Sequence, residues 1–166
     1  MTKDLPLKIE LVPRAIWYSN MRTNMPRSAW DKIRKEVYAQ YNHRCGICQT
    51  SASRMNCHEI WSYDDEKHIQ KLEGFISLCD MCHHCKHMGL AGVLAERGQL
   101  NLEDVVAHFM QVNQCTRKEY QKHSDQAWDQ WEERNKSKEW TTEFGAYAHL
   151  VTLPKTKPND GSAYDR

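Results

Sequence analysis

Apolar residues recur at helical spacing after residue 27 of the chain. One face collects Trp30, Ile33, Val37, Tyr38 and Tyr41, which predicts an amphipathic helix with this face toward a core. We expect the helix to begin at Ser28, since Ser28 can cap it and Asp31 follows at the third helical position.

Two further helices are predicted in the second half of the chain. Asn101 can cap a helix that carries Leu102, Val105, Val106, Phe109 and Met110 on one face. Thr116 and Glu119 form a capping-box pattern that opens another helix, with Tyr120, Ala127, Trp128 and Trp131 as its apolar positions. Both helices are predicted to cover the core.

Between these helical regions, residues 54–61 and 69–78 read as two short strands joined by the polar segment "SYDDEKH". A helix is expected from about Asp80, with Gly89 near its end. The predicted fold class is α+β: a small strand–strand–helix unit flanked by helices. Four parts follow along the chain: an extended segment over 1–27, a central domain over 28–91, a helical extension over 92–153, and a mobile tail over 154–166.

Composition narrows the classes of function only slightly. Hydrophobic residues make up 40% of the chain and charged residues 27%. The net charge of +1 does not favour any class of charged partner. Residues 1–50 nevertheless carry nine Lys and Arg against four Asp and Glu, which suits either a polyanion or a mixed solvated surface. No apolar run is long enough for a membrane span or a signal peptide, so we expect a cytoplasmic protein.

Seven cysteines in a reducing compartment favour metal binding or catalysis over disulfides. Cys45 and Cys48 form one C-x-x-C pair, and Cys79 and Cys82 form a second. Two such pairs can close a tetrahedral Zn²⁺ site, which would be structural because no coordination position stays open. The alternative is that they are ordinary buried cysteines, as we expect for Cys85 and Cys115.

Two histidines next to the second pair suggest another site. If the helix starts near Asp80, His83 and His87 stand at positions i and i+4 and share a face, where they can hold one ion. The alternative is an ordinary helix surface.

In this order, the motifs resemble the HNH endonuclease family. The resemblance is carried by Cys45-Gly-Ile-Cys48, by Cys57-His58-Glu59-Ile60-Trp61, and by Leu78-Cys79-Asp80-Met81-Cys82-His83, and it covers roughly residues 28–91. It implies a ββα-metal finger that holds a divalent ion beside a structural zinc. The family's activity implies hydrolysis of phosphodiester bonds in nucleic acid, with DNA as the first choice, in a small phage or bacterial defence-type protein.

The resemblance also assigns roles to residues. His58 stands where the family has its general base, and His83 and His87 match histidines that bind the catalytic ion, Mg²⁺ or another divalent metal. Basic residues before the finger are candidates for contacts with the nucleic-acid backbone. They are Arg22, Arg27, Lys32, Arg34, Lys35 and Arg44.

The chain departs from the family pattern at two positions. Cys57 replaces the metal-binding Asp or His, and a thiol is a poor ligand for Mg²⁺. Gly74 stands where the family has its asparagine. Asp64 and Asp65 can supply an oxygen ligand or lie on the loop surface. The departures favour a second hypothesis: a zinc-stabilised module with a degenerate nuclease site that binds nucleic acid or protein.

Overall fold

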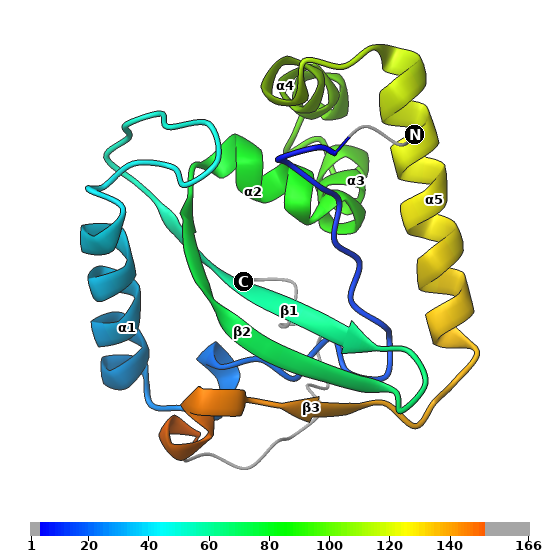
Figure 1. The fold of residues 1–166 in the computed structure, drawn as a ribbon. Coiled ribbons are helices and arrows are strands. Elements are labelled where there is room, and N and C mark those ends of the chain that lie inside the picture. The colour runs from blue at the N-terminus through cyan, green and yellow to red at the C-terminus, as the bar shows by residue number, and fades with distance from the viewer. Residues whose placement is uncertain (1–3, 152–166) are drawn as a thin grey trace.

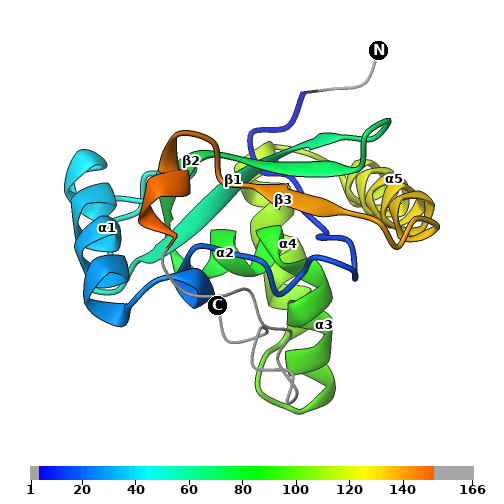
Figure 2. The same ribbon diagram turned by 90° about the horizontal axis from the view of Figure 1, so that it is seen from below.

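A three-stranded sheet forms the middle of the computed structural model, which describes residues 4–151 (Figures 1 and 2). Strands β1 (Asn56–Asp64) and β2 (Ile69–Leu78) pair antiparallel, and β3 (Thr141–Glu143) pairs parallel with the start of β2. Helix α1 (Arg27–Gln40) lies on one side, and α2 (Asp80–Lys86), α3 (Met88–Glu96), α4 (Leu102–Asn113) and α5 (Arg117–Asn135) gather on the other. The predicted α+β class is therefore confirmed.

The hairpin and α2 follow one another in the predicted strand–strand–helix order. β2 has the predicted bounds, whereas β1 begins two residues later and ends three residues later than 54–61. The pairing register shifts between Ile60 and Trp61, as in a β-bulge. Asp64 accepts hydrogen bonds from the backbone N–H groups of Glu66 and Lys67 and so stabilises the turn.

Two helix predictions were wrong in detail. α1 begins at Arg27 with Pro26 as its N-cap residue, so Ser28 lies inside the first turn and caps nothing. The single helix expected after Asp80 is two helices, because the backbone leaves helical geometry at His87, with φ −100° and ψ 54°. Gly89 consequently lies in the first turn of α3 rather than at a helix end.

The helices of the second half agree with their sequence signals. The Asn101 side chain accepts hydrogen bonds from Glu103 and Asp104 N–H at the start of α4. Thr116 and Glu119 form the reciprocal capping box of α5. Strand β3, the 3₁₀ helix η1 (Arg22–Asn24) and the 3₁₀ helix η2 (Gly145–Leu150) were not predicted. The predicted tail, 154–166, lies outside the described residues.

The N-terminal segment, residues 4–21, has no helix or strand, as expected, but it is part of the core. Leu5, Leu7 and Ile9 alternate inward into a first cluster of buried residues, which also contains Phe109 and Val105 of α4. Asn113 fixes this segment through two hydrogen bonds to the backbone of Leu7. A second cluster lies on the other side of the sheet and joins it to α1 and to the residues that follow β3. Its buried members are Met21, Met25, Trp30, Leu72 and Phe144.

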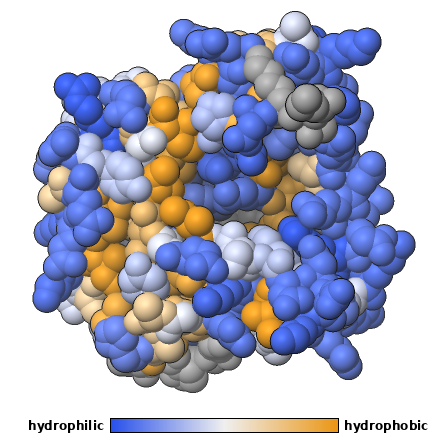
Figure 3. All heavy atoms as spheres, in the orientation of Figure 1, coloured by the Kyte–Doolittle hydropathy of each residue, from blue (hydrophilic) through white to orange (hydrophobic). Residues whose placement is uncertain are grey.

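The surface reflects this arrangement. In Figure 3, hydrophilic residues cover the rim on both sides, where Figure 1 places α1 and α5, and hydrophobic residues gather toward the middle. Within residues 4–151, no helix is both long enough and apolar enough to cross a bilayer.

Candidate metal centres and the adjoining cavity

The two C-x-x-C pairs meet at one point. The sulfur atoms of Cys45, Cys48, Cys79 and Cys82 all lie within 4.8 Å of one another, and none is in a disulfide. The Sγ atoms of Cys48 and Cys79 are 3.6 Å apart, close to the roughly 3.8 Å between ligands of a tetrahedral zinc with Zn–S bonds of about 2.3 Å. The donor set and its spacing therefore fit Zn²⁺.

Local backbone contacts shape this cysteine group. The Gly46 N–H donates to the Ser77 carbonyl, which joins the first pair to the end of β2, and the Cys82 N–H donates to the sulfur of Cys79. A Cβ at Gly46 would lie 2.7 Å from the Ile76 side chain and 2.8 Å from that of Tyr41, so these side chains would have to shift to admit a larger residue. Hydrogen bonds from Cys79 and Cys82 lower the pKa of Cys45, which favours the thiolate that zinc requires.

His108 of α4 is a neighbour of this group that the sequence did not reveal. Its Nε2 lies 3.2 Å from the sulfur of Cys82, close enough for an N–H···S hydrogen bond. Burial lowers the pKa of His108, so the ring favours its neutral form.

Three histidines form the second group. One ring nitrogen from each of His58, His83 and His87 lies within 4.8 Å of the others. His58 is a buried residue of β1, and the other two come from α2 and the residue that ends it. The spacing of His83 and His87 predicted their proximity. The placement of His58 beside both is compatible with a third ligand as well as with a base.

A carboxylate from the N-terminal segment touches this histidine group. Glu10 places Oε2 2.7 Å from Nε2 of His58 and Oε1 2.9 Å from Nζ of Lys86. Burial raises the pKa of Glu10, but the hydrogen bond and charge of His58, together with Lys86, outweigh it and hold the pKa at about 2. No sequence signal pointed to Glu10, since 48 positions separate it from His58.

Two cavities meet at the histidine group. The smaller, of about 20 Å³, has room for one ion or water and is lined by Glu10, His58, His83 and His87, among others. The larger, of about 540 Å³, is in the size range of ligand pockets. Cys57, Glu59 and His83 line both cavities, so the histidine group borders the larger one directly.

Arginines dominate the charged lining of the larger cavity. Arg22, Arg27, Arg34 and Arg54 line it together with two carboxylate residues, Asp31 and Glu59. The sequence singled out the first three arginines and missed Arg54. Asp31 pairs with Arg34 at 2.8 Å, and the Glu59 carboxylate accepts a hydrogen bond from Met21 N–H at 3.0 Å.

Other predicted site residues lie elsewhere. Lys32 and Lys35 are exposed on α1 outside the cavity lining, and Arg44 donates to the carbonyl of Gln49. Asp64 is the last residue of β1, and Asp65 follows in the turn, where it pairs with Arg134 at 2.7 Å, so neither joins the histidine group.

Cys57 and Gly74, the two departures from the family pattern, have different surroundings, and those of Gly74 do not require a glycine. Burial raises the pKa of Cys57 to about 12, and its side chain packs against the second cluster, so it suits packing better than ligation. Gly74 pairs with Ile60 in the hairpin, and a side chain there would meet only the hydroxyl of Tyr147 at 3.8 Å.

No match was found when the chain was compared with protein-family models, with curated proteins and with solved structures. What the chain does is therefore inferred from the geometry and chemistry of its own residues.

Proposed function

We propose that this chain is a metal-dependent endonuclease of the HNH type, which hydrolyses phosphodiester bonds in nucleic acid, with DNA as the first substrate to test. One observation carries the proposal: three histidines converge on one point at the edge of an arginine-lined cavity. Neither feature alone suggests hydrolysis. Together they support it, because residues suited to a cation lie beside arginines, which suit phosphate.

His83 and His87 are the residues that would hold the divalent ion, and His58 is near enough to join them. Imidazole nitrogens suit zinc, nickel, copper and iron, whereas Mg²⁺ prefers oxygen ligands. The donor set therefore favours a transition metal over the Mg²⁺ that the family resemblance first suggests. Such an ion, when bound, neutralises charge that develops on a phosphate oxygen.

The protein's own groups would bind the substrate and move the proton. Arginine suits phosphate because its planar group donates two parallel hydrogen bonds. Hydrolysis joins the oxygen of water to phosphorus and breaks a phosphorus–oxygen ester bond, while the proton of water passes to a base. In this proposal the base is His58, which would take the proton on Nδ1, because Nε2 contacts Glu10.

Cleavage of supercoiled plasmid, and of single-stranded DNA and RNA, with Zn²⁺, Ni²⁺, Mn²⁺, Mg²⁺ or EDTA tests the activity. We expect metal-stimulated cutting that falls at least about tenfold in His87→Ala. Absence of cutting with every metal and substrate would support a zinc-stabilised binding module instead.

His58→Ala separates the two roles open to His58. If His58 is the base, cleavage falls about 10²- to 10⁴-fold while binding of the second metal persists. If His58 is a ligand, metal affinity falls as it does in His87→Ala. Calorimetric titration of Zn²⁺ into protein with a filled cysteine group distinguishes these results.

Arg54→Ala tests the cavity. Loss of one phosphate contact should weaken binding to all sequences alike and reduce the slope of log affinity against log salt by about one. Lys35→Ala is the matched control, because Lys35 is an exposed cation outside the cavity lining. Equal effects of the two substitutions would contradict a role for the cavity.

A further inference from the structure

The carboxylate of Glu10 is engaged on both oxygens. Oε2 contacts Nε2 of His58, and Oε1 contacts the ammonium of Lys86, whose side chain is only 11% exposed. In addition, the Glu10 backbone N–H donates to the carbonyl of Lys86 at 2.9 Å. Three contacts thus hold Glu10 against the end of α2 and against β1.

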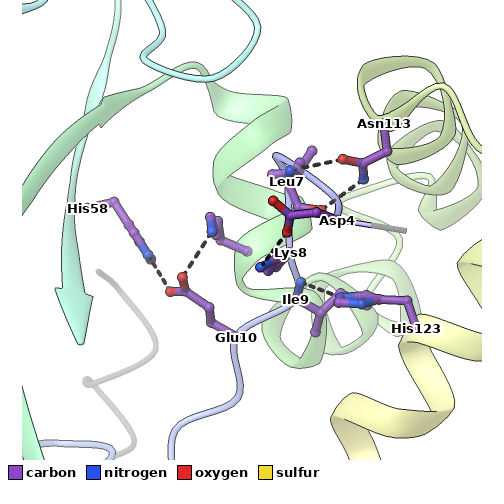
Figure 4. A network of polar contacts seen from close by, with 9 residues as sticks. Asp4, Leu7, Lys8, Ile9, Glu10, His58, Asn113 and His123 are labelled. Carbon is purple, nitrogen blue, oxygen red and sulfur yellow. Dashed lines mark hydrogen bonds and ion pairs between the residues drawn. The ribbon is translucent and has the colours of Figure 1, made fainter. Parts of the chain in front are cut away.

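Contacts with the C-terminal helices hold the segment that carries Glu10 (Figure 4). Asn113 of α4 pairs with both backbone groups of Leu7, and His123 of α5 accepts a hydrogen bond from Ile9 N–H at 3.0 Å. In Figure 4, Glu10 points from this segment toward His58, away from the helices that anchor it. Glu10 is therefore presented from a fixed backbone.

A carboxylate bound to one ring nitrogen determines what the other nitrogen can do. The carboxylate accepts a hydrogen bond, so the proton of a neutral His58 stays on Nε2. Nδ1 is then unprotonated and can bind an ion or accept a proton. Carboxylates play this part beside metal-binding histidines and beside histidine bases in general.

We propose that Glu10 is the positioning residue of His58, and that α4 and α5 contribute to the candidate site by holding the segment that presents it. Glu10 fixes the tautomer and the orientation of the His58 ring and does not itself bind the ion. The inference rests on the proposed function only in assigning His58 to the site, and it holds whether His58 is ligand or base.

The first test observes the ring directly. In full-length protein with zinc in the cysteine group, nitrogen-15 NMR at about pH 8, above the ordinary range of imidazole titration, identifies the protonated nitrogen of His58. We expect Nε2–H in the parent, both before and after Zn²⁺ fills the histidine group. Glu10→Ala should show a mixture of both tautomers. A proton on Nδ1 in the parent would overturn the inference. Loss of the proton from Nε2 on zinc binding would also overturn it, since Nε2 would then bind the ion and could no longer donate to Glu10.

The second test measures affinity of the histidine group for added Zn²⁺ by calorimetry. We expect Glu10→Ala to weaken binding about 10- to 100-fold. Glu10→Gln keeps a carbonyl that accepts from Nε2–H, so it should preserve the tautomer and most of the affinity.

Lys8→Met is the matched control, since it removes an exposed ion pair with Asp4 on the same segment, without contact to His58. It should bind Zn²⁺ as the parent does. Equal affinities of Glu10→Ala and Lys8→Met would refute a positioning role. Neither measurement uses nucleic acid, so a protein that cuts nothing can still confirm or refute it.

Discussion

His123 must be neutral to accept a hydrogen bond from Ile9 N–H. Burial lowers its pKa below the ordinary value of about 6.5, and the charges of Lys8 and Lys86 lower it further. Between the folded pKa and about 6.5 the unfolded chain therefore binds more protons than the folded chain. The contribution of neutral His123 to the unfolding free energy is therefore fully present above about pH 6.5 and declines as the pH falls below that value.

The substitution His123→Gln isolates this effect, because glutamine offers an acceptor oxygen and does not titrate. We expect the parent to lose unfolding free energy relative to His123→Gln as the pH falls from about 8 to about 5, by at most about 1.4 kcal/mol per pH unit. Urea unfolding of both proteins at several pH values measures the difference. A difference that stays constant with pH would show that His123 does not titrate as described.

Individual site residues were predictable where a local pattern carried the information. The i, i+4 spacing put His83 and His87 together, and the repeated C-x-x-C pattern put four sulfurs together. His58 was found only through the family resemblance. Glu10 and Arg54 carried no signal, since what places them is a tertiary contact and a cavity wall, and neither leaves a pattern in neighbouring residues.

At the scale of elements, two capping signals that look alike in the sequence have different outcomes. Thr116 caps α5, whereas Ser28 lies inside α1. Both residues are exposed, so their replacement leaves core packing alone. Pro26 lies outside α1, with a ψ of 147°, and the helix begins at the next residue, Arg27.

We therefore expect Thr116→Ala to reduce the unfolding free energy by about 1 kcal/mol, the usual cost of a lost N-cap. Ser28→Ala should change it by less than about 0.5 kcal/mol, as for an ordinary surface substitution. Chemical denaturation of the two variants checks both values. A larger loss for Ser28→Ala than for Thr116→Ala would contradict the helix boundaries.

The elements that escaped prediction are those with little sequence pattern of their own. β3 has three residues, too few to show alternation, and it forms because it pairs with Ile69–Lys71 of β2. The break between α2 and α3 falls within the histidine group, where His87 ends one helix and precedes the next. The sequence pattern from Asp80 onward predicted one helix through His87, so only the tertiary structure revealed the break.

At the scale of the whole molecule, the two metal groups have different relations to the core. Cys45, Cys79 and Cys82 are buried within the first hydrophobic cluster, alongside residues from the N-terminal segment and α4. The cysteine group joins the loop after α1 to the junction of β2 and α2. His83 and His87 are only half-buried and border a cavity. The cysteine group is thus part of the core, and the histidine group lies at the edge of the core.

This difference predicts opposite results for the two groups. Because the cysteine group exists only in the folded chain, the free energy of zinc binding adds to the free energy of folding. Cys79→Ser should lose its zinc and unfold or aggregate, and Cys115→Ser, the same change outside the group, should remain folded. His87→Ala should keep one zinc per chain and shift the thermal midpoint by only about a few degrees. Elemental analysis and thermal unfolding measure both quantities. An intact fold without zinc would show that the cysteines only pack, and unfolding of His87→Ala as severe as that of Cys79→Ser would make His87 structural.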